Sequence, residues 1–215
     1  MASVPLTVAI SASFGAGGNV LGPDVAERLG LPFFDRAIPA AVAARLAVPI
    51  EEAAAQDEKA PSTWARLARA FANMAVPMAP QNLDPGEDPD RFKEQTEGIL
   101  RQIATTTGGV VLGRGAAVVL GGRHDVLRVR LHGDPGARAA RVAVREGLDL
   151  ETARRMQRET DEARDHYLRL FYRVRPGDPA LYDLVVDSVR IPIGVCTELI
   201  VLAAADLGKT LGAGG

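Results

Sequence analysis

The sequence predicts an α/β protein in which a parallel sheet is covered by helices on both faces. Three observations support this class. Short β-type segments alternate with helical patterns, most strand interiors are apolar and only Val126–Leu131 alternates weakly, and a glycine-rich loop joins the first strand to the first helix. Uniformly apolar strands are typical of parallel sheets buried on both sides. A chain of 215 residues accommodates one such domain with one large insertion.

The first strand and the first helix flank the glycine-rich segment Ser11–Asn19. The apolar run Leu6–Ile10 predicts the strand, and a helical pattern follows from about Asn19. Its apolar residues recur at a spacing of four: Leu21, Val25 and Leu29. Proline is tolerated in a first helical turn but kinks a helix interior, so Gly22-Pro23 leaves open a helix that begins only at Pro23.

Strand, glycine loop and helix together are the layout of a phosphate-binding loop. Glycines let backbone N–H groups point into one concavity, and the helix N-terminus adds partial positive charge. The Walker pattern G-x-x-x-x-G-K-[ST] is incomplete, because Gly18 stands at the lysine position and Asn19 at the hydroxyl position. A tight turn that binds nothing is therefore the alternative. The candidate donor-binding residues in the loop are Ser13, Phe14, Gly15, Ala16, Gly17, Gly18 and Asn19.

The rest of the chain continues the alternation, interrupted by residues 49–107, which contain no convincing strand. We interpret 49–107 as a helical insertion, and 1–48 with 108–215 as the α/β core. The expected elements, in order, are a strand at Pro32–Phe34, helices at Pro39–Val48, Ile50–Asp57, Ser62–Met78 and Pro89–Thr107, a strand and turn at Gly108–Gly115, a strand at Val126–Leu131, a helix from Pro135 to Glu146 capped by Asp134, a charged helix capped by Asp149 and reaching about Arg175, a strand at Tyr182–Asp187 and a helix at Gly194–Leu207.

Polar residues follow several of these strands. Ligands of open parallel sheets bind at the carboxyl ends of the strands, so we expect these residues to lie along one edge. They are Ser11–Asn19, Asp35-Arg36, Arg114 and Asp187-Ser188. Only three of the 25 basic residues are lysines, Lys59, Lys93 and Lys209. A phosphate clamp in this protein must therefore be built mainly from arginine, which binds phosphate bidentately.

Composition limits the partners and the compartment. A net charge of −2 gives no reason to expect nucleic acid or an anionic membrane surface as a partner. Cys196 is the single cysteine, which excludes an internal disulfide and a multi-cysteine metal site. No charged and then apolar leader opens the sequence, and no apolar run reaches about 18 residues. We therefore expect a cytoplasmic protein that does not enter a membrane.

The segment Arg154–Tyr172 is dense in charge. At helical spacings of three and four, Arg154, Arg158, Asp161 and either Arg164 or Asp165 fall on a single face. One interpretation is a solvated helix with internal ion pairs. The other is an arginine-bearing lid over phosphates, in which Asp161 orients a guanidinium or a sugar hydroxyl.

Five segments, in this order and spacing, resemble the cytidylate kinase-like proteins of the P-loop nucleoside monophosphate kinase group. They are AISASFGAGGNVLG, LPFFDR, VVLGRGAAVVL, REGLDLETARRMQRETDEARDHYLRLFY and YDLVVDS. The resemblance implies a three-layer α/β/α fold with a five-stranded parallel sheet in the order 2-3-1-4-5. It also implies that residues 49–107 bind the acceptor nucleotide and that about 147–175 form the lid.

The resemblance also assigns acceptor-side residues. The family's G-R-D turn corresponds to Gly113-Arg114-Gly115, so Arg114 matches the arginine that holds the acceptor phosphate, whereas Gly115 replaces an aspartate. The family's R-D-x-x-D-x-x-R helix survives as Asp161-x-x-Arg164, with Gln157 in place of the first arginine. Asp35 and Arg36 stand where the family has its acceptor-side loop.

Two functional hypotheses follow. The first is a kinase that transfers the γ-phosphoryl group of ATP–Mg²⁺ to a nucleoside monophosphate such as CMP. The loop with Asp187 and Ser188 would hold the donor, Arg154 and Arg158 would act in catalysis, and Mg²⁺ would be held largely by phosphates and water. The second is a catalytically degenerate nucleotide-binding or regulatory protein. Both imply nucleotides as partners, and self-association through residues 49–107 is a further hypothesis.

Overall fold

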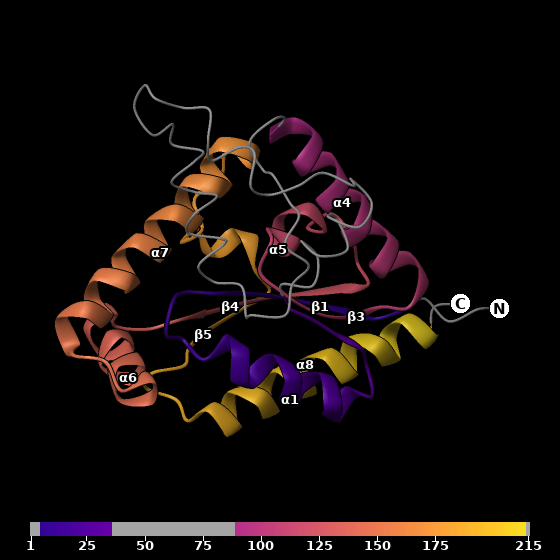
Figure 1. Cartoon of the computed structure of the whole chain (residues 1–215). Coiled ribbons are helices and arrows are strands. Elements are labelled where there is room, and N and C mark those ends of the chain that lie inside the picture. Colours follow the sequence, from indigo (N-terminus) through magenta and orange to yellow (C-terminus); the bar gives the residue numbers. More distant parts are fainter. Residues whose placement is uncertain (1–4, 36–88, 214–215) are drawn as a thin grey trace.

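A computed structural model describes residues 5–35 and 89–213 of the chain. Five strands form one parallel sheet in the order β2-β3-β1-β4-β5 (Figure 1), which confirms the expected topology. The strands are β1 (Thr7–Ala12), β2 (Phe33–Asp35), β3 (Gly109–Leu112), β4 (Val126–His132) and β5 (Leu184–Asp187). Because all five run in the same direction, their carboxyl ends share one edge of the sheet.

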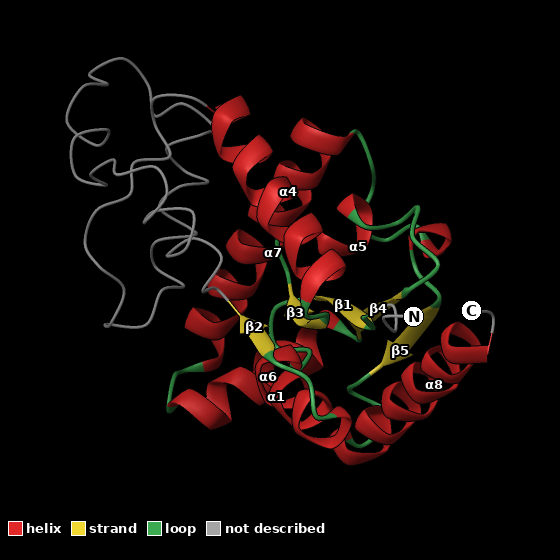
Figure 2. Cartoon of the chain, turned by 90° about the vertical axis from the view of Figure 1, so that its right-hand side faces the viewer, coloured by secondary structure: helices red, strands yellow, loops and turns green. Residues whose placement is uncertain are grey.

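Helices cover both faces of the sheet, as Figures 1 and 2 show. On one face lie α1 (Gly18–Leu29) and α8 (Ile193–Ala213), and on the other lie α4 (Pro89–Thr106) and α5 (Ala116–Val119). Successive residues of β1 enter opposite cores: Val8 and Ile10 pack on the α1 and α8 side, whereas Ala9 packs on the α4 and α5 side. The molecule therefore has the three-layer α/β/α arrangement.

Helix α4 confirms the helix expected at the end of the predicted insertion. Its buried residues Ile99, Leu100, Ile103 and Ala104 pack in the same core cluster as Ala9 and Val111 of the sheet. This end of the insertion is therefore part of the second helical layer. Arg36 and the helices expected between residues 39 and 78 lie outside the described residues, so an acceptor-binding role for 49–107 stays a proposal.

Helix α1 begins at Gly18, so the alternative start at Pro23 is wrong. Gly17, at a left-handed φ of 85°, caps the helix, and its carbonyl accepts hydrogen bonds from the amides of Val20 and Leu21, both at 3.0 Å. Pro23 lies inside the helix. Gly22 is explained by packing, because a Cβ there would lie 2.6 Å from the ring of Phe33 on β2.

The two helices that reach the loop begin at the expected caps. Asp134 accepts from the Ala137 amide at the start of α6 (Pro135–Glu146), and Asp149 accepts from the Thr152 amide at the start of α7 (Leu150–Tyr172), both at 2.8 Å. Helix α7 is three residues shorter than expected, since Arg173 takes a left-handed φ of 54° and ends it. Within the described ranges, no helix combines the length and apolarity that a membrane span requires.

The last strand and the last helix differ from expectation at their ends. A short 3₁₀ turn, η1 (Pro179–Leu181), precedes Tyr182, so β5 begins only at Leu184. The hydroxyl of Tyr182 donates to the carbonyl of Pro176 at 3.0 Å, which holds this residue in the loop. Helix α8 continues to Ala213, beyond the expected end at Leu207.

Two glycines with left-handed φ values follow helix ends, and they test the close packing of the turn between α4 and β3 against the backbone of Leu6. A Cβ on Gly108 (φ 63°) would lie 2.2 Å from the carbonyl oxygen of Leu6, whereas a Cβ on Gly147 (φ 66°) would meet nothing within 4 Å. Gly147→Ala should lower the free energy of unfolding by about 1 kcal/mol, from the left-handed backbone alone. Gly108→Ala should lose roughly 1–3 kcal/mol more through overpacking, measured by urea denaturation. Equal losses in the two variants would contradict this packing.

Candidate functional site

The loop between β1 and α1 presents backbone N–H groups that have no partner. Gly15 and Gly17 take left-handed φ values of 74° and 85°, which turns the chain around a concavity. The amides of Gly15, Gly17, Gly18 and Asn19 donate to no acceptor within residues 5–35 and 89–213. Unpaired amides in a turn at a helix N-terminus are an anion-binding arrangement.

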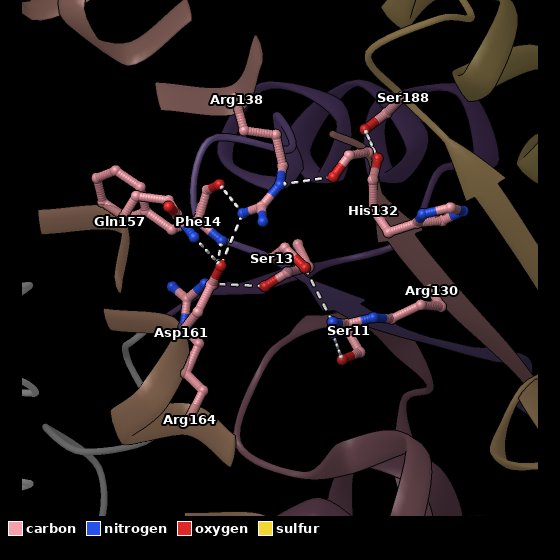
Figure 3. Close-up of polar contacts among 12 residues, drawn as sticks. Ser11, Ser13, Phe14, Arg130, His132, Arg138, Gln157, Asp161, Arg164 and Ser188 are labelled. Carbon is pink, nitrogen blue, oxygen red and sulfur yellow. Dashed lines mark hydrogen bonds and ion pairs between the residues drawn. The ribbon is translucent and has the colours of Figure 1, made fainter. Parts of the chain in front are cut away.

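Arginines from three different elements bind three consecutive loop residues (Figure 3). Arg164 of α7 donates to the Ala12 carbonyl at 2.8 Å. Arg130 of β4 donates to the Ser13 hydroxyl at 2.9 Å. Arg138 of α6 donates to the Phe14 carbonyl at 2.6 Å. The first half of the loop is thus fixed by cations from β4, α6 and α7.

Helix α6 carries a row of arginines along the loop, at residues 138, 141 and 145. The Nη2 group of Arg141 donates to the Ser188 carbonyl at 2.8 Å. Its Nη1 group is buried without a hydrogen-bond partner, 3.7 Å from where a Cβ on Gly17 would stand. Arg145 lies 3.5 Å from the side-chain oxygen of Asn19. A buried donor without an acceptor is unfavourable, so Arg141 adds a cation suited to an anion at this end of the loop.

Asp161 joins α7 to both the loop and α6. Its Oδ1 accepts from the Phe14 amide, and its Oδ2 accepts from Arg138 and from the Gln157 amide group, each at 2.8 Å (Figure 3). The Arg138 side chain is only 6% exposed and that of Asp161 is 23% exposed. The carboxylate therefore neutralises a buried cation. Of the two roles expected for Asp161, the geometry shows the orientation of a guanidinium.

Arg154 and Arg158 lie away from these contacts. Both are exposed, and neither forms a hydrogen bond or an ion pair with another described residue. The inward face of α7 is formed instead by Gln157, Asp161 and Arg164, which lie one turn apart. The surroundings of Arg154 and Arg158 in this conformation are those of a solvated helix face, and their catalytic role stays a prediction.

Arg114 lies just after β3, in the middle of three consecutive residues with left-handed backbone conformations. Gly113, Arg114 and Gly115 all take left-handed φ values, of 84°, 59° and 69°. Such a conformation is uncommon for a residue with a side chain, and it occurs at functional sites. The Arg114 charge acts on Tyr167 of α7, whose hydroxyl pKa is raised by burial and lowered in part by that charge. Arg114 therefore lies between β3 and α7.

An aspartate at position 115, where the resemblance places one, would be tightly packed. A Cβ on Gly115 would lie 3.2 Å from the Tyr172 ring and 3.3 Å from Leu168, both on α7, so these side chains would have to shift by a few tenths of an ångström. Packing opposes the Walker lysine at position 18 more strongly. A Cβ on Gly18 would lie 2.8 Å from the Ala12 methyl and 2.9 Å from Leu112. The packing around the loop and the turn is thus built for glycine at both positions.

The other expected site residues lie at the same carboxyl edge, as predicted. Asp35 is the half-buried last residue of β2, and Asp187 is the last residue of β5. Hydrogen bonds from the backbone amides of Arg190 and Val189 lower the pKa of Asp187 and commit this carboxylate to a turn. Ser188 is fully buried, with its hydroxyl 2.6 Å from the Ala16 carbonyl. It can influence a ligand only by supporting the loop.

Sequence reasoning missed three residues of this site: Arg130, Arg138 and Arg141. A signal for the arginines of α6 was present, because residues 138, 141 and 145 share one face at spacings of three and four. The alternation in VLRVRL also indicated that Arg128 and Arg130 share one face of β4. Gln157 was marked by the resemblance as standing at the position of a family arginine, but its contact with Asp161 was not expected.

Mg²⁺ would find few protein ligands at the loop. The described residues contain no group of three His, Cys, Asp or Glu side chains that could hold a metal ion. The Ser13 hydroxyl accepts from Arg130, and both oxygens of Asp161 accept hydrogen bonds. The exposed Asn19 side chain also offers an oxygen, which has only a long 3.5 Å hydrogen bond from Arg145. This donor set fits an ion that is coordinated mainly by phosphates and water.

The sheet order, the glycine loop before α1 and the arginines around it define a P-loop α/β fold. Comparison with known proteins agrees. The cytidylate kinase-like family matches residues 7–190, and the chain belongs to that family. A cytidylate kinase of Methanopyrus kandleri is 40% identical over 96 residues, a match that covers 40% of this chain and 50% of that kinase. The chain thus spans about half the length of this curated relative.

Two solved structures share the fold. A protein of Eubacterium ventriosum with no assigned function superposes with a TM-score of 0.67 at 20% identity, covering 93% of this chain and 98% of that one. A gluconokinase of Sinorhizobium meliloti superposes with a TM-score of 0.54 at 18% identity, covering 100% of this chain and 99% of that one. At these identities the likeness extends to the fold alone.

The Asp161–Arg138 pair provides a prediction about stability. Asp161→Asn should lower the free energy of unfolding by about 3 kcal/mol, because it leaves the buried Arg138 cation without its counter-ion. Asp165→Asn, one turn later on α7, is the matched control. Burial raises the pKa of Asp165, its carboxylate is 43% exposed, and its partner Arg169 is 3.7 Å away. The control should change stability by no more than about 0.5 kcal/mol in urea denaturation. Equal effects of the two substitutions would contradict the assigned pair.

Proposed function

We propose that this protein is a nucleotide kinase that transfers the γ-phosphoryl group of ATP to a nucleoside monophosphate, with CMP as the first candidate. The observation that carries this proposal is the anion site at the loop. Four unpartnered backbone amides lie beside the unpartnered, buried Nη1 of Arg141. Amides fixed in this way, together with a desolvated guanidinium, suit the phosphates of a nucleotide donor.

In this proposal the donor and the acceptor occupy different sides of the loop. The amides of Gly15–Asn19 and Arg141 bind the donor phosphates, with Asn19 next to the Mg²⁺ that would accompany them. Mg²⁺ supplies charge neutralisation of the transferring group. Arg114, just after β3, and Arg164, within α7, bind the acceptor phosphate, and Asp35 and Arg36 complete that side.

The protein's own contribution to such a reaction is positioning and charge. Phosphoryl transfer requires donor and acceptor oxygens in line and cations around the moving group. Asp161 and Ser188 act through the loop, whose backbone they hold. Arg154 and Arg158 would approach the phosphates only in a conformation other than the one described. A kinase of free nucleotides would work in the cytoplasm, which is the location we propose.

A second candidate function is supported by a specific observation. The packing around Gly18 and Gly115 opposes the lysine of the Walker pattern at one position and the aspartate of the family's G-R-D turn at the other. Both oxygens of Asp161 are engaged within the protein. These features favour a nucleotide-binding or regulatory protein of the same fold that has lost turnover.

One experiment separates the two candidates. The purified protein is incubated with ATP–Mg²⁺ and each of the common nucleoside monophosphates, and formation of ADP and nucleoside diphosphate is measured. Binding of ATP and CMP is measured in parallel by calorimetry. A kinase gives acceptor-dependent ADP formation, greatest with CMP. Nucleotide binding with no product at any enzyme concentration supports the degenerate protein.

Arg114 provides a prediction on the acceptor side. Arg114→Ala should raise the KM for the acceptor and lower kcat/KM at least ~10-fold, since a charge-assisted contact contributes about 1.5–3 kcal/mol. The KM for ATP should change little. Arg28→Ala is the control, because Arg28 is an exposed residue of α1 paired with Asp24. Unchanged acceptor kinetics for Arg114→Ala would remove Arg114 from the site.

Arg154 and Arg158 provide a prediction about lid function. If α7 moves so that these arginines reach the transferring group, Arg154→Ala or Arg158→Ala lowers kcat strongly and leaves ATP affinity nearly unchanged. Arg155→Ala is the control, since Arg155 is another exposed arginine of the same turn. Full kcat in both test variants would show that this part of α7 is a solvated helix.

A further inference from the structure

Arg130 of β4 is half-buried, and among the described residues no carboxylate lies within ion-pair distance of it. Arg128, two residues earlier on the same face of β4, pairs with Asp183, and this hydrogen bond lowers the pKa of that aspartate. Arg138 of α6 pairs with Asp161. The hydrogen bonds of the Arg130 guanidinium within the described part of the chain go to the hydroxyls of Ser11 and Ser13, at 2.8 and 2.9 Å, and the charge of Asp165 on α7 acts on it only from beyond ion-pair distance. Charges removed from water are usually paired, so this cation suits an anionic ligand.

The register of the sheet places Arg130 beside the loop. Ser11 of β1 is the direct partner of Arg130 in the parallel pairing. The partner of Arg128 is Ala9, which lies in the core cluster on the α4 and α5 side. Residues two apart share a face of a strand, so Arg130 points to this side as well. Arg114 follows β3, the strand on the other side of β1. Arg130 and Arg114 therefore flank the end of β1 from opposite sides.

The loop itself cannot supply a lysine cation at position 18. The Ala12 methyl and the Leu112 side chain fill the space in which a side chain would begin. Any transfer of a phosphoryl group at this loop still requires positive charge next to the moving group. Arg130 is bonded to the Ser13 hydroxyl, two residues before the first free amide at Gly15. With five N–H donors in a guanidinium, hydrogen bonds to the two serines leave others for a ligand.

We propose that Arg130 binds the terminal phosphoryl group of the donor nucleotide and supplies the charge that a loop lysine would otherwise provide. The inference rests on the proposed function. The amides of Gly15–Asn19 and Arg141 hold the inner phosphates at the helix end of the loop. The terminal phosphoryl then lies toward the strand end, where Arg130 meets Ser13 between the donor and Arg114.

The test measures binding, so that it does not depend on turnover. Calorimetry compares a non-hydrolysable ATP analogue, ADP and CMP, each with Mg²⁺, on the full chain. Arg130→Met should lower the affinity for the ATP analogue at least ~10-fold, which is the effect of losing one charge-assisted contact. The affinities for ADP and CMP should change less than about 3-fold. Arg130→Lys should recover part of the lost affinity. Arg128→Met is the matched control and should leave all three affinities unchanged.

The outcomes separate this inference from the proposed function. A selective loss for the ATP analogue supports it, even if the wild-type protein transfers no phosphoryl group. Unchanged ATP affinity in Arg130→Met overturns it, and normal wild-type turnover would then leave the kinase assignment standing. A loss of affinity confined to CMP also overturns it, because Arg130 would then belong to the acceptor-binding site. Equal losses for all three ligands, or the same loss in Arg128→Met, would indicate a damaged sheet edge and would overturn it as well.

Discussion

The organisation of the site depends on one buried ion pair, Asp161 with Arg138. A guanidinium that is 6% exposed would be very unfavourable without its carboxylate, so the two helices α6 and α7 must remain next to the loop together. The same carboxylate accepts the Phe14 amide, and the same guanidinium donates to the Phe14 carbonyl. The peptide groups on both sides of Phe14 are therefore fixed by side chains from outside the loop. Gly15 follows, and its nearest neighbours on that side belong to α6.

The close contact between α6 and the loop depends on Gly15 having no side chain. A Cβ there would lie 2.6 Å from the Arg138 carbonyl oxygen, so the helix backbone lies directly on the loop. This contact places the α6 arginines within hydrogen-bond distance of loop residues from Phe14 to Asn19. The cations beside the loop are consequently carried by a neighbouring helix and strand, whereas the Walker pattern places a lysine in the loop itself.

The fold could be predicted from the sequence because its signals are local and repeated. Uniformly apolar strands, the Asp134 and Asp149 caps and the glycine loop each act over a few residues, and all indicate the same architecture. The start of α1 was less certain because Gly22-Pro23 has the composition of a turn. The glycine at position 22 is required by a tertiary contact, the Phe33 ring packed against it, and no local sequence pattern reveals that contact.

The sequence predicted the sheet edge at which the site lies, but it did not predict the contacts between the site residues. The carboxyl-end rule brought together the loop, Asp35, Arg114 and Asp187. The spacing on α7 placed Arg154 and Arg158 on one face with Asp161 and Arg164, and this grouping was wrong. The neutral Gln157 lies inward with Asp161, whereas Arg154 and Arg158 lie in solvent. Which residue of a charged helix is buried depends on the partner helix, here on the position of Arg138. A sequence read one element at a time does not contain that information.

The lengths of the strands affect whether two molecules of this protein can associate through the edges of their sheets. The outermost strands β2 and β5 have three and four residues, whereas the two central strands β1 and β4 have six and seven and the inner strand β3 has four. Both outer strands also end in an aspartate. A short edge strand offers few backbone hydrogen bonds to a strand from another molecule, and a charge at its end disfavours such pairing further. The two edges of the sheet therefore resist lateral growth into aggregates, although β1 and β3 in its interior are strongly apolar.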